Sequence, residues 1–171
     1  MSDTLDRLLA RYEHGHITRR ELLASIAALA ASGAAAHAAE PAIGMVKQVN
    51  HVTVFVKDVQ KSQQLYQELF GLPLLTRQDP GVNLNAGNGF FGIYPAQGQA
   101  ATGINHVCFG LDNFDADAVL KKLADRGLKG NIRLRGDTKE LYFTDADNVR
   151  VQLQDVRYIG GTGPLGDRPP K

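Results

Sequence analysis

Val49-Asn50-His51-Val52-Thr53-Val54-Phe55-Val56 is the stretch that decides the fold, because a later stretch of the chain begins in the same way. The later stretch is Ile104-Asn105-His106-Val107-Cys108-Phe109-Gly110-Leu111, and the two Asn-His-Val starts lie 55 residues apart. Both are rich in β-branched residues that alternate along the chain, which predicts a strand. Self-similarity at a fixed separation predicts an internal repeat.

Each predicted strand is followed by an amphipathic segment that predicts a helix. The apolar stripes are Leu65, Tyr66, Leu69 and Phe70 in the first half and Val119, Leu120, Leu123 and Ala124 in the second. Gly71 and Gly127 follow these stripes and are placed to end the helices. Three short strand-like runs come next in each half, at 74–77, 82–85 and 90–94, and at 131–134, 140–144 and 149–154. The sequence therefore predicts an α+β domain of two βαβββ modules.

The two leading strands each present a polar and an apolar face, since side chains alternate along a strand. His51 shares its face with Thr53, and His106 shares its face with Cys108. The opposite face of each strand is apolar, so we expect it to pack against the helix that follows. Both histidines then point to the other side of the sheet.

Bulk composition limits the classes of function. A chain of 171 residues suits one domain with appendages. Its formal net charge of +1 produces no strong field toward nucleic acid or an anionic membrane, and neither is an expected partner. Cys108 is the single cysteine in the sequence, which excludes an intramolecular disulfide.

Residues 1–38 resemble an export leader. Thr18-Arg19-Arg20-Glu21 precedes the uncharged run 22–36, and Ala36-His37-Ala38 follows as a small-x-small site. This order is typical of a secretory signal, and the paired arginines resemble a twin-arginine signal. We therefore expect a periplasmic protein with no stable membrane association once the leader is removed. The alternative is an Ala-rich amphipathic helix docked on the domain of a cytoplasmic protein.

The remaining boundaries follow from composition. We expect a linker at 39–46, the repeat domain at 47–156, and a flexible tail at 157–171, where glycine and proline are frequent.

A metal site is predicted from the repeat. His51 and His106 occupy equivalent places, so pseudo-twofold packing would bring their faces together, although a lone histidine on a strand is often structural. Gln152 lies on the polar face of the last strand, with Arg150 and Gln154, and offers a third donor. The equivalent place in the first half falls near Gly92, which has no side chain. The pattern predicts three ligands with open positions for water or substrate.

Residues 47–155 resemble the vicinal oxygen chelate superfamily, which includes glyoxalase I, extradiol dioxygenases and bleomycin-resistance proteins. The resemblance implies a half-open eight-stranded barrel around a central cleft, with a divalent metal held by His51, His106 and Gln152. Residues 141–152 are similar to the extradiol signature, in which a tyrosine precedes the ligand glutamate by ten residues, as Tyr142 precedes Gln152. Tyr142 would then orient or protonate a substrate oxygen. Glutamine in place of the usual glutamate leaves the ion its full +2 charge, which favours an anionic substrate.

Further residues are candidates for the cleft. Glu140 alternates with Tyr142 and is a candidate general base at the rim, with solvent exposure as the alternative. Substrate contacts are expected from Arg150, Gln154, Thr53, Cys108, Tyr94 and Phe90. Cys108 could instead be a buried small hydrophobe, and the two aromatic residues could belong to the core.

These observations predict an enzyme that acts on a small molecule with two adjacent oxygens. Iron, manganese, nickel or zinc would serve as the Lewis acid or as the O₂ site. Isomerase, lyase and dioxygenase chemistry all stay open. A metal-free module that binds a small molecule is the alternative, and a third hypothesis makes the cleft the interface of a homodimer.

Overall fold

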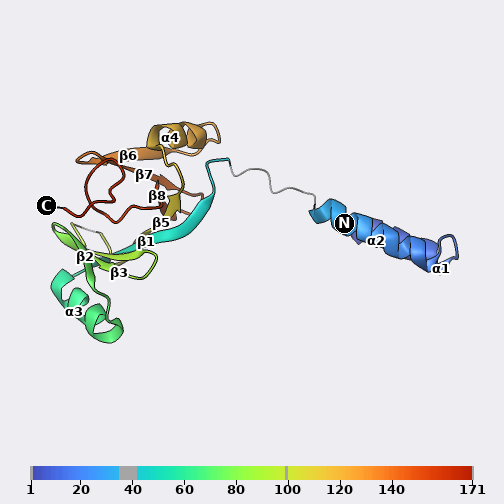
Figure 1. Cartoon of the computed structure of the whole chain (residues 1–171), viewed down its shortest axis with the longest axis horizontal. Coiled ribbons are helices and arrows are strands. Elements are labelled where there is room, and N and C mark those ends of the chain that lie inside the picture. The colour runs from blue at the N-terminus through green and yellow to red at the C-terminus, as the bar shows by residue number, and fades with distance from the viewer. Residues whose placement is uncertain (1, 35–41, 99, 171) are drawn as a thin grey trace. The chain divides into compact units, whose positions relative to one another are not determined.

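A computed structural model describes residues 2–34, 42–98 and 100–170 (Figure 1). The chain divides into two compact units, residues 1–41 and residues 42–171. The first unit holds α1 (Ser2–Glu13) and α2 (Arg19–Ala34). Within the described residues, no helix is both long and apolar enough to cross a membrane. The Ala36-His37-Ala38 motif lies outside the described residues, so the export leader stays a prediction.

A capping box begins α2. The backbone N–H of Thr18 donates to the Glu21 carboxylate at 2.7 Å, and the N–H of Glu21 donates to the Thr18 hydroxyl at 3.3 Å. This reciprocal pair satisfies two backbone donors at the start of the helix. The bond from Thr18 also lowers the pKa of Glu21. Arg19 and Arg20 therefore stand in the first turn of a helix that carries the apolar run.

The second unit contains the two predicted modules. The first comprises β1 (Val46–Val56), α3 (Val59–Phe70), β2 (Leu74–Gln78), β3 (Gly81–Asn85) and β4 (Phe90–Pro95). The second comprises β5 (Gly103–Leu111), α4 (Ala116–Ala124), β6 (Gly130–Arg135), β7 (Thr138–Thr144) and β8 (Arg150–Asp155). In the described part of the chain, eight strands form one curled sheet in the order β2-β3-β4-β1-β5-β8-β7-β6 (Figure 1). This confirms the predicted α+β fold and its half-open barrel.

The register at the centre of the sheet makes the two halves equivalent. β1 and β5 pair antiparallel, and each pairs in parallel with the last strand of its own module. Thr53 lies opposite Gly92 on β4, and Cys108 lies opposite Gln152 on β8. Gly92 and Gln152 therefore occupy corresponding places, as the sequence predicted. A Cβ at Gly92 would lie 2.9 Å from Thr53 Oγ1, so the first half has no room there for a fourth donor.

Aspartate side chains begin both helices of the second unit, and Gly71 ends the first of them, as its position predicted. Asp58 caps α3 by accepting from the N–H of Lys61, and Asp115 caps α4 by accepting from two N–H groups. Gly71 ends α3 at φ 65°, a left-handed conformation that glycine adopts without strain.

Two hydrophobic clusters lie between the sheet and the helices. The larger one packs α4 against the second module and includes Leu111, Val119, Leu123, Leu141 and Leu153. The smaller one consists of Val82, Leu84 and Ile93, with Val54, Val56 and Tyr66 packed against it. The apolar faces of both leading strands thus face the helices, as expected.

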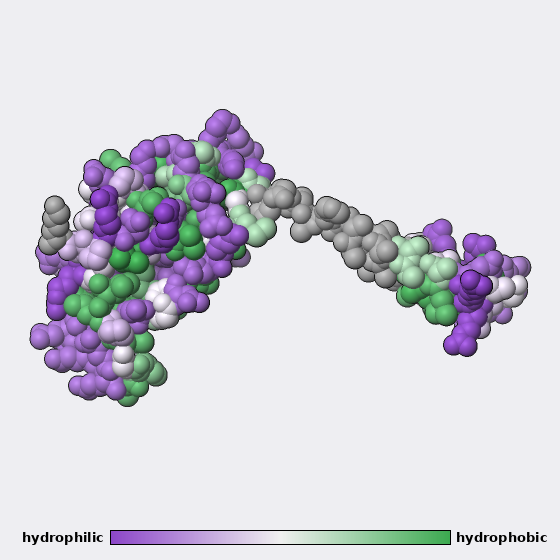
Figure 2. Space-filling view, in the orientation of Figure 1, coloured by the Kyte–Doolittle hydropathy of each residue, from purple (hydrophilic) through white to green (hydrophobic). Residues whose placement is uncertain are grey.

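The stripe of α3 contributes less to the core than its spacing suggests. Of its four residues, Tyr66 packs on the sheet, with its ring 4.7 Å from that of Phe91. Leu65, Leu69 and Phe70 are 49%, 62% and 66% exposed. Figure 2 shows hydrophobic residues at the surface where α3 lies in Figure 1.

The end of the chain differs from the flexible tail that composition predicted. Tyr158 is buried, and the Thr138 hydroxyl donates to the carbonyl of Gly163 at 2.5 Å. A Cβ at Gly161 would collide with the carbonyl oxygen of Arg168. Glycine is therefore frequent here because the chain approaches itself closely, and not because it is loose. Residue 171 lies outside the described residues.

Candidate metal centre and cleft

A cleft with a cavity volume of about 70 Å³ lies on the polar face of the sheet. Its residues alternate along the strands with those of the two hydrophobic clusters, so it faces away from the helices. Nine of the predicted site residues line it: His51, Thr53, Phe90, Tyr94, His106, Glu140, Tyr142, Arg150 and Gln152.

The three predicted metal ligands converge in this cleft. His51 Nε2 lies 3.2 Å from His106 Nε2 and 3.2 Å from Gln152 Oε1. The two imidazole rings stand nearly perpendicular, at 81°. All three side chains are buried, because they come from the central strands β1, β5 and β8.

The protonation of His51 is fixed by Asn50. The Asn50 amide nitrogen donates to the carbonyl oxygens of Val156 and Tyr158, at 3.2 and 2.9 Å. The other end of the amide must then be the oxygen, which lies 2.9 Å from His51 Nδ1. His51 Nδ1 therefore carries the hydrogen and donates, which leaves Nε2 with a free lone pair.

His106 is fixed in the same way by a different partner. Arg150 Nη1 donates to the Asn105 side chain at 3.1 Å, and because arginine only donates, the accepting atom is the oxygen. The same oxygen accepts from His106 Nδ1 at 2.8 Å. His106 Nε2 is therefore also a free lone pair.

Both histidines are neutral at pH 7. Burial lowers the pKa of His51 well below its usual range, with a further contribution from His106. Burial, followed by the charge of Arg150, lowers the pKa of His106 to about 4. Two nitrogen lone pairs and an amide oxygen thus face one another with no proton between them.

This arrangement fits a cation. Three converging acceptors repel one another unless a positive charge lies among them, and Gln152 Nε2 is buried with no hydrogen-bond partner. Within the described residues, no three His, Cys, Asp or Glu side chains form a metal-binding group. A third donor beside the two imidazoles would therefore be the amide oxygen of Gln152, which lies 3.2 Å from His51 Nε2.

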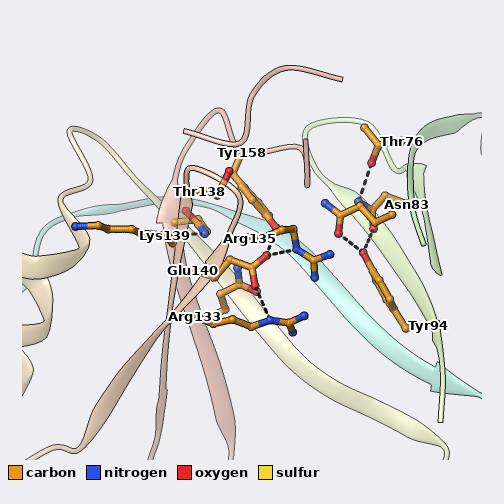
Figure 3. Close-up of polar contacts among 12 residues, drawn as sticks. Thr76, Asn83, Tyr94, Arg133, Arg135, Thr138, Lys139, Glu140 and Tyr158 are labelled. Carbon is orange, nitrogen blue, oxygen red and sulfur yellow. Dashed lines mark hydrogen bonds and ion pairs between the residues drawn. The ribbon is translucent and has the colours of Figure 1, made fainter. Parts of the chain in front are cut away.

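Glu140 is the centre of a second polar network (Figure 3). Tyr142 and Tyr158 donate their hydroxyls to it at 3.0 and 2.9 Å, and Arg135 Nε donates at 2.9 Å. Arg133 lies 3.9 Å away. The side chain is 1% exposed, so the exposed alternative considered for Glu140 is wrong. Both oxygens of Glu140 already accept hydrogen bonds. Its main role is therefore to hold Tyr142, Tyr158 and Arg135 in place, and not to act as a general base.

Tyr142 is held as a neutral phenol. Burial and the neighbouring Glu140 raise its pKa above the usual range. The Arg150 guanidinium lies 4.3 Å from the centre of its ring, a cation–π contact. Tyr142 can therefore donate a hydrogen bond at neutral pH but cannot act as a base.

The remaining cleft residues form its walls. The Phe90 ring stacks on that of His51 at 4.2 Å. Tyr94 donates to Gln78 at 2.5 Å and to Asn83 at 3.1 Å, and burial raises the pKa of Tyr94 to about 12 (Figure 3).

Cys108 and Gln154 are not brought to the cleft, which corrects the expectation that they contact substrate. Both are completely buried, because neighbouring strands and side chains cover them. Gln154 donates to the backbone carbonyl of Lys139 at 3.0 Å. Burial raises the pKa of the Cys108 thiol well above its usual range, so the buried small hydrophobe describes it better.

Sequence reasoning missed several residues of the site. Asn50, Asn105, Arg133, Arg135, Gln78 and Tyr158 all contact or line it. The repeated Asn-His pair was visible in both halves and could have identified the two asparagines. Tyr158 gave no such signal, since it lies in the segment that composition assigned to a tail.

Residues 48–153 match the family model described as the glyoxalase/bleomycin resistance protein/dioxygenase superfamily. The metallothiol transferase FosB of Staphylococcus haemolyticus is 26% identical over 131 residues, covering 72% of this chain and 89% of that protein. The glutathione transferase FosA of Serratia marcescens is 26% identical over 117 residues, covering 64% and 81%.

Solved structures share the fold. The methylmalonyl-CoA epimerase of Mycobacterium tuberculosis superposes with a TM-score of 0.55 at 16% identity, covering 64% of this chain and 88% of that one. A Streptomyces coelicolor methylmalonyl-CoA epimerase gives a TM-score of 0.52 at 17% identity, covering 64% and 94%. At such identities the likeness concerns architecture alone.

Proposed function

The chain belongs to the glyoxalase/bleomycin resistance protein/dioxygenase superfamily, and from this premise we propose that it is a divalent-metal-dependent enzyme acting on a small anionic molecule with adjacent oxygens. The single observation that carries the proposal is the convergence of two unprotonated imidazole nitrogens and an amide oxygen. His51, His106 and Gln152 would hold the ion. When bound, a divalent ion supplies Lewis-acid polarisation of substrate oxygens, or a site for O₂ if it is iron.

The charge of the cleft favours an anionic substrate. Arg133, Arg135 and Arg150 line it, and Glu140 is the opposing anion. With both histidines neutral, the lining carries two more positive than negative charges before any metal is counted. Arg150 keeps further N–H donors beyond the one given to Asn105, and these can orient a carboxylate or a similar oxyanion.

Tyr142 is the proposed proton-holding residue. Its hydroxyl points at Glu140 in the structure, and its raised pKa keeps the proton on the phenol. It can therefore turn this hydrogen bond toward a substrate oxygen, while Glu140 maintains the orientation of the ring. Phe90 and Tyr158 exclude water on the side of His51.

The relatives support the metal. One is named a metallothiol transferase and another a glutathione transferase, and both align with the domain that carries the three ligands. From these relatives we infer that this chain uses a metal and a small-molecule substrate. Substrate screening is the measurement that assigns the reaction.

Elemental analysis of protein purified without chelator tests the proposal. We expect one divalent ion of iron, manganese, nickel or zinc per chain, and its loss in His51→Ala and His106→Ala. His16→Ala, in the other unit, is the matched control and should keep the metal. Metal-loaded protein should then turn over a member of a panel of catechols and 2-oxoaldehyde adducts, and chelation should abolish the turnover.

A metal-free binding module is the second candidate. If the Gln152 amide is turned by 180°, its nitrogen donates to His51 Nε2, which removes one of the facing acceptors without a cation. Metal-free protein that binds its ligand equally well in the His51→Ala and His106→Ala variants would establish this function instead.

We also propose that residues 1–38 are a twin-arginine-like export leader. Support comes from the order of its parts and from the helix that starts at the paired arginines. N-terminal sequencing of protein recovered from the periplasm should begin shortly after Ala38. Full-length protein confined to the cytoplasm would favour the docked helix.

We also propose that the protein forms a homodimer. Sedimentation of the purified domain should give twice the mass of the chain. If cleft variants lose the dimer while retaining ligand affinity, the cleft is an interface instead of a binding site.

A further inference from the structure

The C-terminal segment, Val156–Arg168, lies against both modules. On the first module the carbonyl of Ile159 accepts from the Thr76 hydroxyl at 3.2 Å. On the second module the Thr138 hydroxyl donates to Gly163, and Tyr158 donates to Glu140. Figure 3 shows Tyr158 reaching Glu140 between these neighbours. The segment thus connects the two halves across the site.

The segment holds Asn50 through its backbone. Its carbonyls at Val156 and Tyr158 take both hydrogen bonds of the Asn50 amide nitrogen. Asn50 is 1% exposed, so in the intact chain these two carbonyls, and not water, satisfy its nitrogen. The amide is left with its oxygen toward His51 Nδ1, which is the orientation that frees Nε2.

The segment also packs on the same imidazole. The Tyr158 ring lies 5.5 Å from that of His51 and 5.9 Å from that of Phe90, which itself stacks on His51. Tyr158 is 4% exposed. Orientation and tautomer of one predicted ligand therefore both depend on residues beyond the last strand.

The second module is built differently. Asn105 is oriented by the Arg150 side chain, and no residue of the C-terminal segment bonds to it within the described ranges. The backbone bonds to Asn50 therefore act on His51 directly, and the segment reaches the second module only through the bond from Tyr158 to Glu140. This asymmetry supplies an internal control.

We propose that the segment Val156–Arg168 belongs to the metal centre. Through Asn50, the segment holds His51 in the tautomer that binds metal. Asn50 and Tyr158 are positioning residues, and the inference rests on the proposed function. A partner of this kind typically changes metal affinity by about 10–100-fold when it is removed.

Long-range ¹H–¹⁵N NMR of the imidazoles tests the inference in metal-free protein. The intact chain should show His51 and His106 both protonated on Nδ1. A chain ending at Asp155 should show mixed tautomers at His51 and an unchanged His106. An unchanged His51, or equal loss of preference at both histidines, overturns the inference. If the shortened chain does not fold, Asn50→Ala in the intact chain removes the group that the carbonyls of Val156 and Tyr158 hold. It should give mixed tautomers at His51 with His106 unchanged, and an unchanged His51 there also overturns the inference.

Titration with Co²⁺ adds a double-mutant cycle. Shortening the chain should weaken Co²⁺ binding by about tenfold or more. In an Asn50→Ala background it should add little, because the link is already broken, whereas in an Asn105→Ala background its full effect should remain. Additive losses in both backgrounds overturn the inference. Absence of Co²⁺ binding in the intact chain refutes the proposed function instead, and the tautomer measurement still tests the segment.

Discussion

At the scale of single residues, Gln152 sets the charge of the proposed metal centre. Two neutral imidazoles and one amide give a ligand set with no formal charge, so a divalent ion would keep its full +2. A neutral set binds a cation more weakly than one with a carboxylate, but leaves more attraction for an anionic substrate.

Gln152→Glu should therefore tighten metal binding. We expect a gain of about tenfold or more in affinity, equivalent to about 1.4 kcal/mol, together with weaker binding of anionic ligands. Titration with Zn²⁺ measures the first effect, and inhibition by small carboxylates measures the second. Gln154→Glu is the control on the same strand, because Gln154 is buried away from the cleft. An equal gain in that variant would contradict the assignment.

The two histidines also predict how stability varies with pH. Burial lowers the pKa of His106 to about 4 and lowers that of His51 as well, whereas in the unfolded chain both titrate near 6.5. Between these values the unfolded chain binds more protons, so stability is full above about pH 6.5 and is lost as the pH falls toward 4. Metal-free protein should lose about 2 kcal/mol through His106 between pH 7 and pH 5, and His51 should add to the loss in the same direction.

Urea denaturation at both pH values measures this loss. The dependence should shrink in His106→Asn and persist in His16→Asn, since His16 is exposed in the other unit. A stability that is flat from pH 7 to pH 5 would contradict the burial of the two imidazoles as neutral groups.

At the scale of elements, the two helices contribute unequally to the core. α4 buries Ala116, Val119 and Leu123, whereas α3 has no fully buried residue. The alternation of the strands is similar in both modules, so the difference lies in how each helix meets the sheet.

Leu123→Ala should lower the free energy of unfolding by about 2–5 kcal/mol, because it opens a cavity under a side chain with no exposed surface. Leu69→Ala makes the same chemical change on α3, where the side chain is 62% exposed. It should cost no more than about 0.5 kcal/mol. Chemical denaturation compares the two, and similar losses would show that α3 is buried against a partner.

At the scale of the whole molecule, residues 1–41 and residues 42–171 are separate compact units. Both hydrophobic clusters and the cleft are made by residues of the second unit. A chain that begins at residue 42 should therefore keep its free energy of unfolding within about 0.5 kcal/mol and keep its metal affinity. A loss of several kcal/mol would support the docked helix over the export leader.

The sequence by itself determined the two βαβββ modules, the faces of their leading strands, and the residues proposed as ligands. These features rest on periodicity, capping and repetition, which are local and can be read along the chain. Gln152 was predicted because it lies on the polar face of the last strand, which alternation assigns to the side of the two histidines.

Only the tertiary structure decided which side chains meet and in what state. Asn50 bonds to Tyr158 across 108 residues, and His51 lies against Gln152 across 101 residues. Contacts of this kind fix the tautomers of the two histidines and bury Glu140 between two tyrosines. They also place the glycine-rich C-terminal segment along the side of the site. No local pattern encodes them, because they arise when β1, β5 and β8 come together and the last residues close over them.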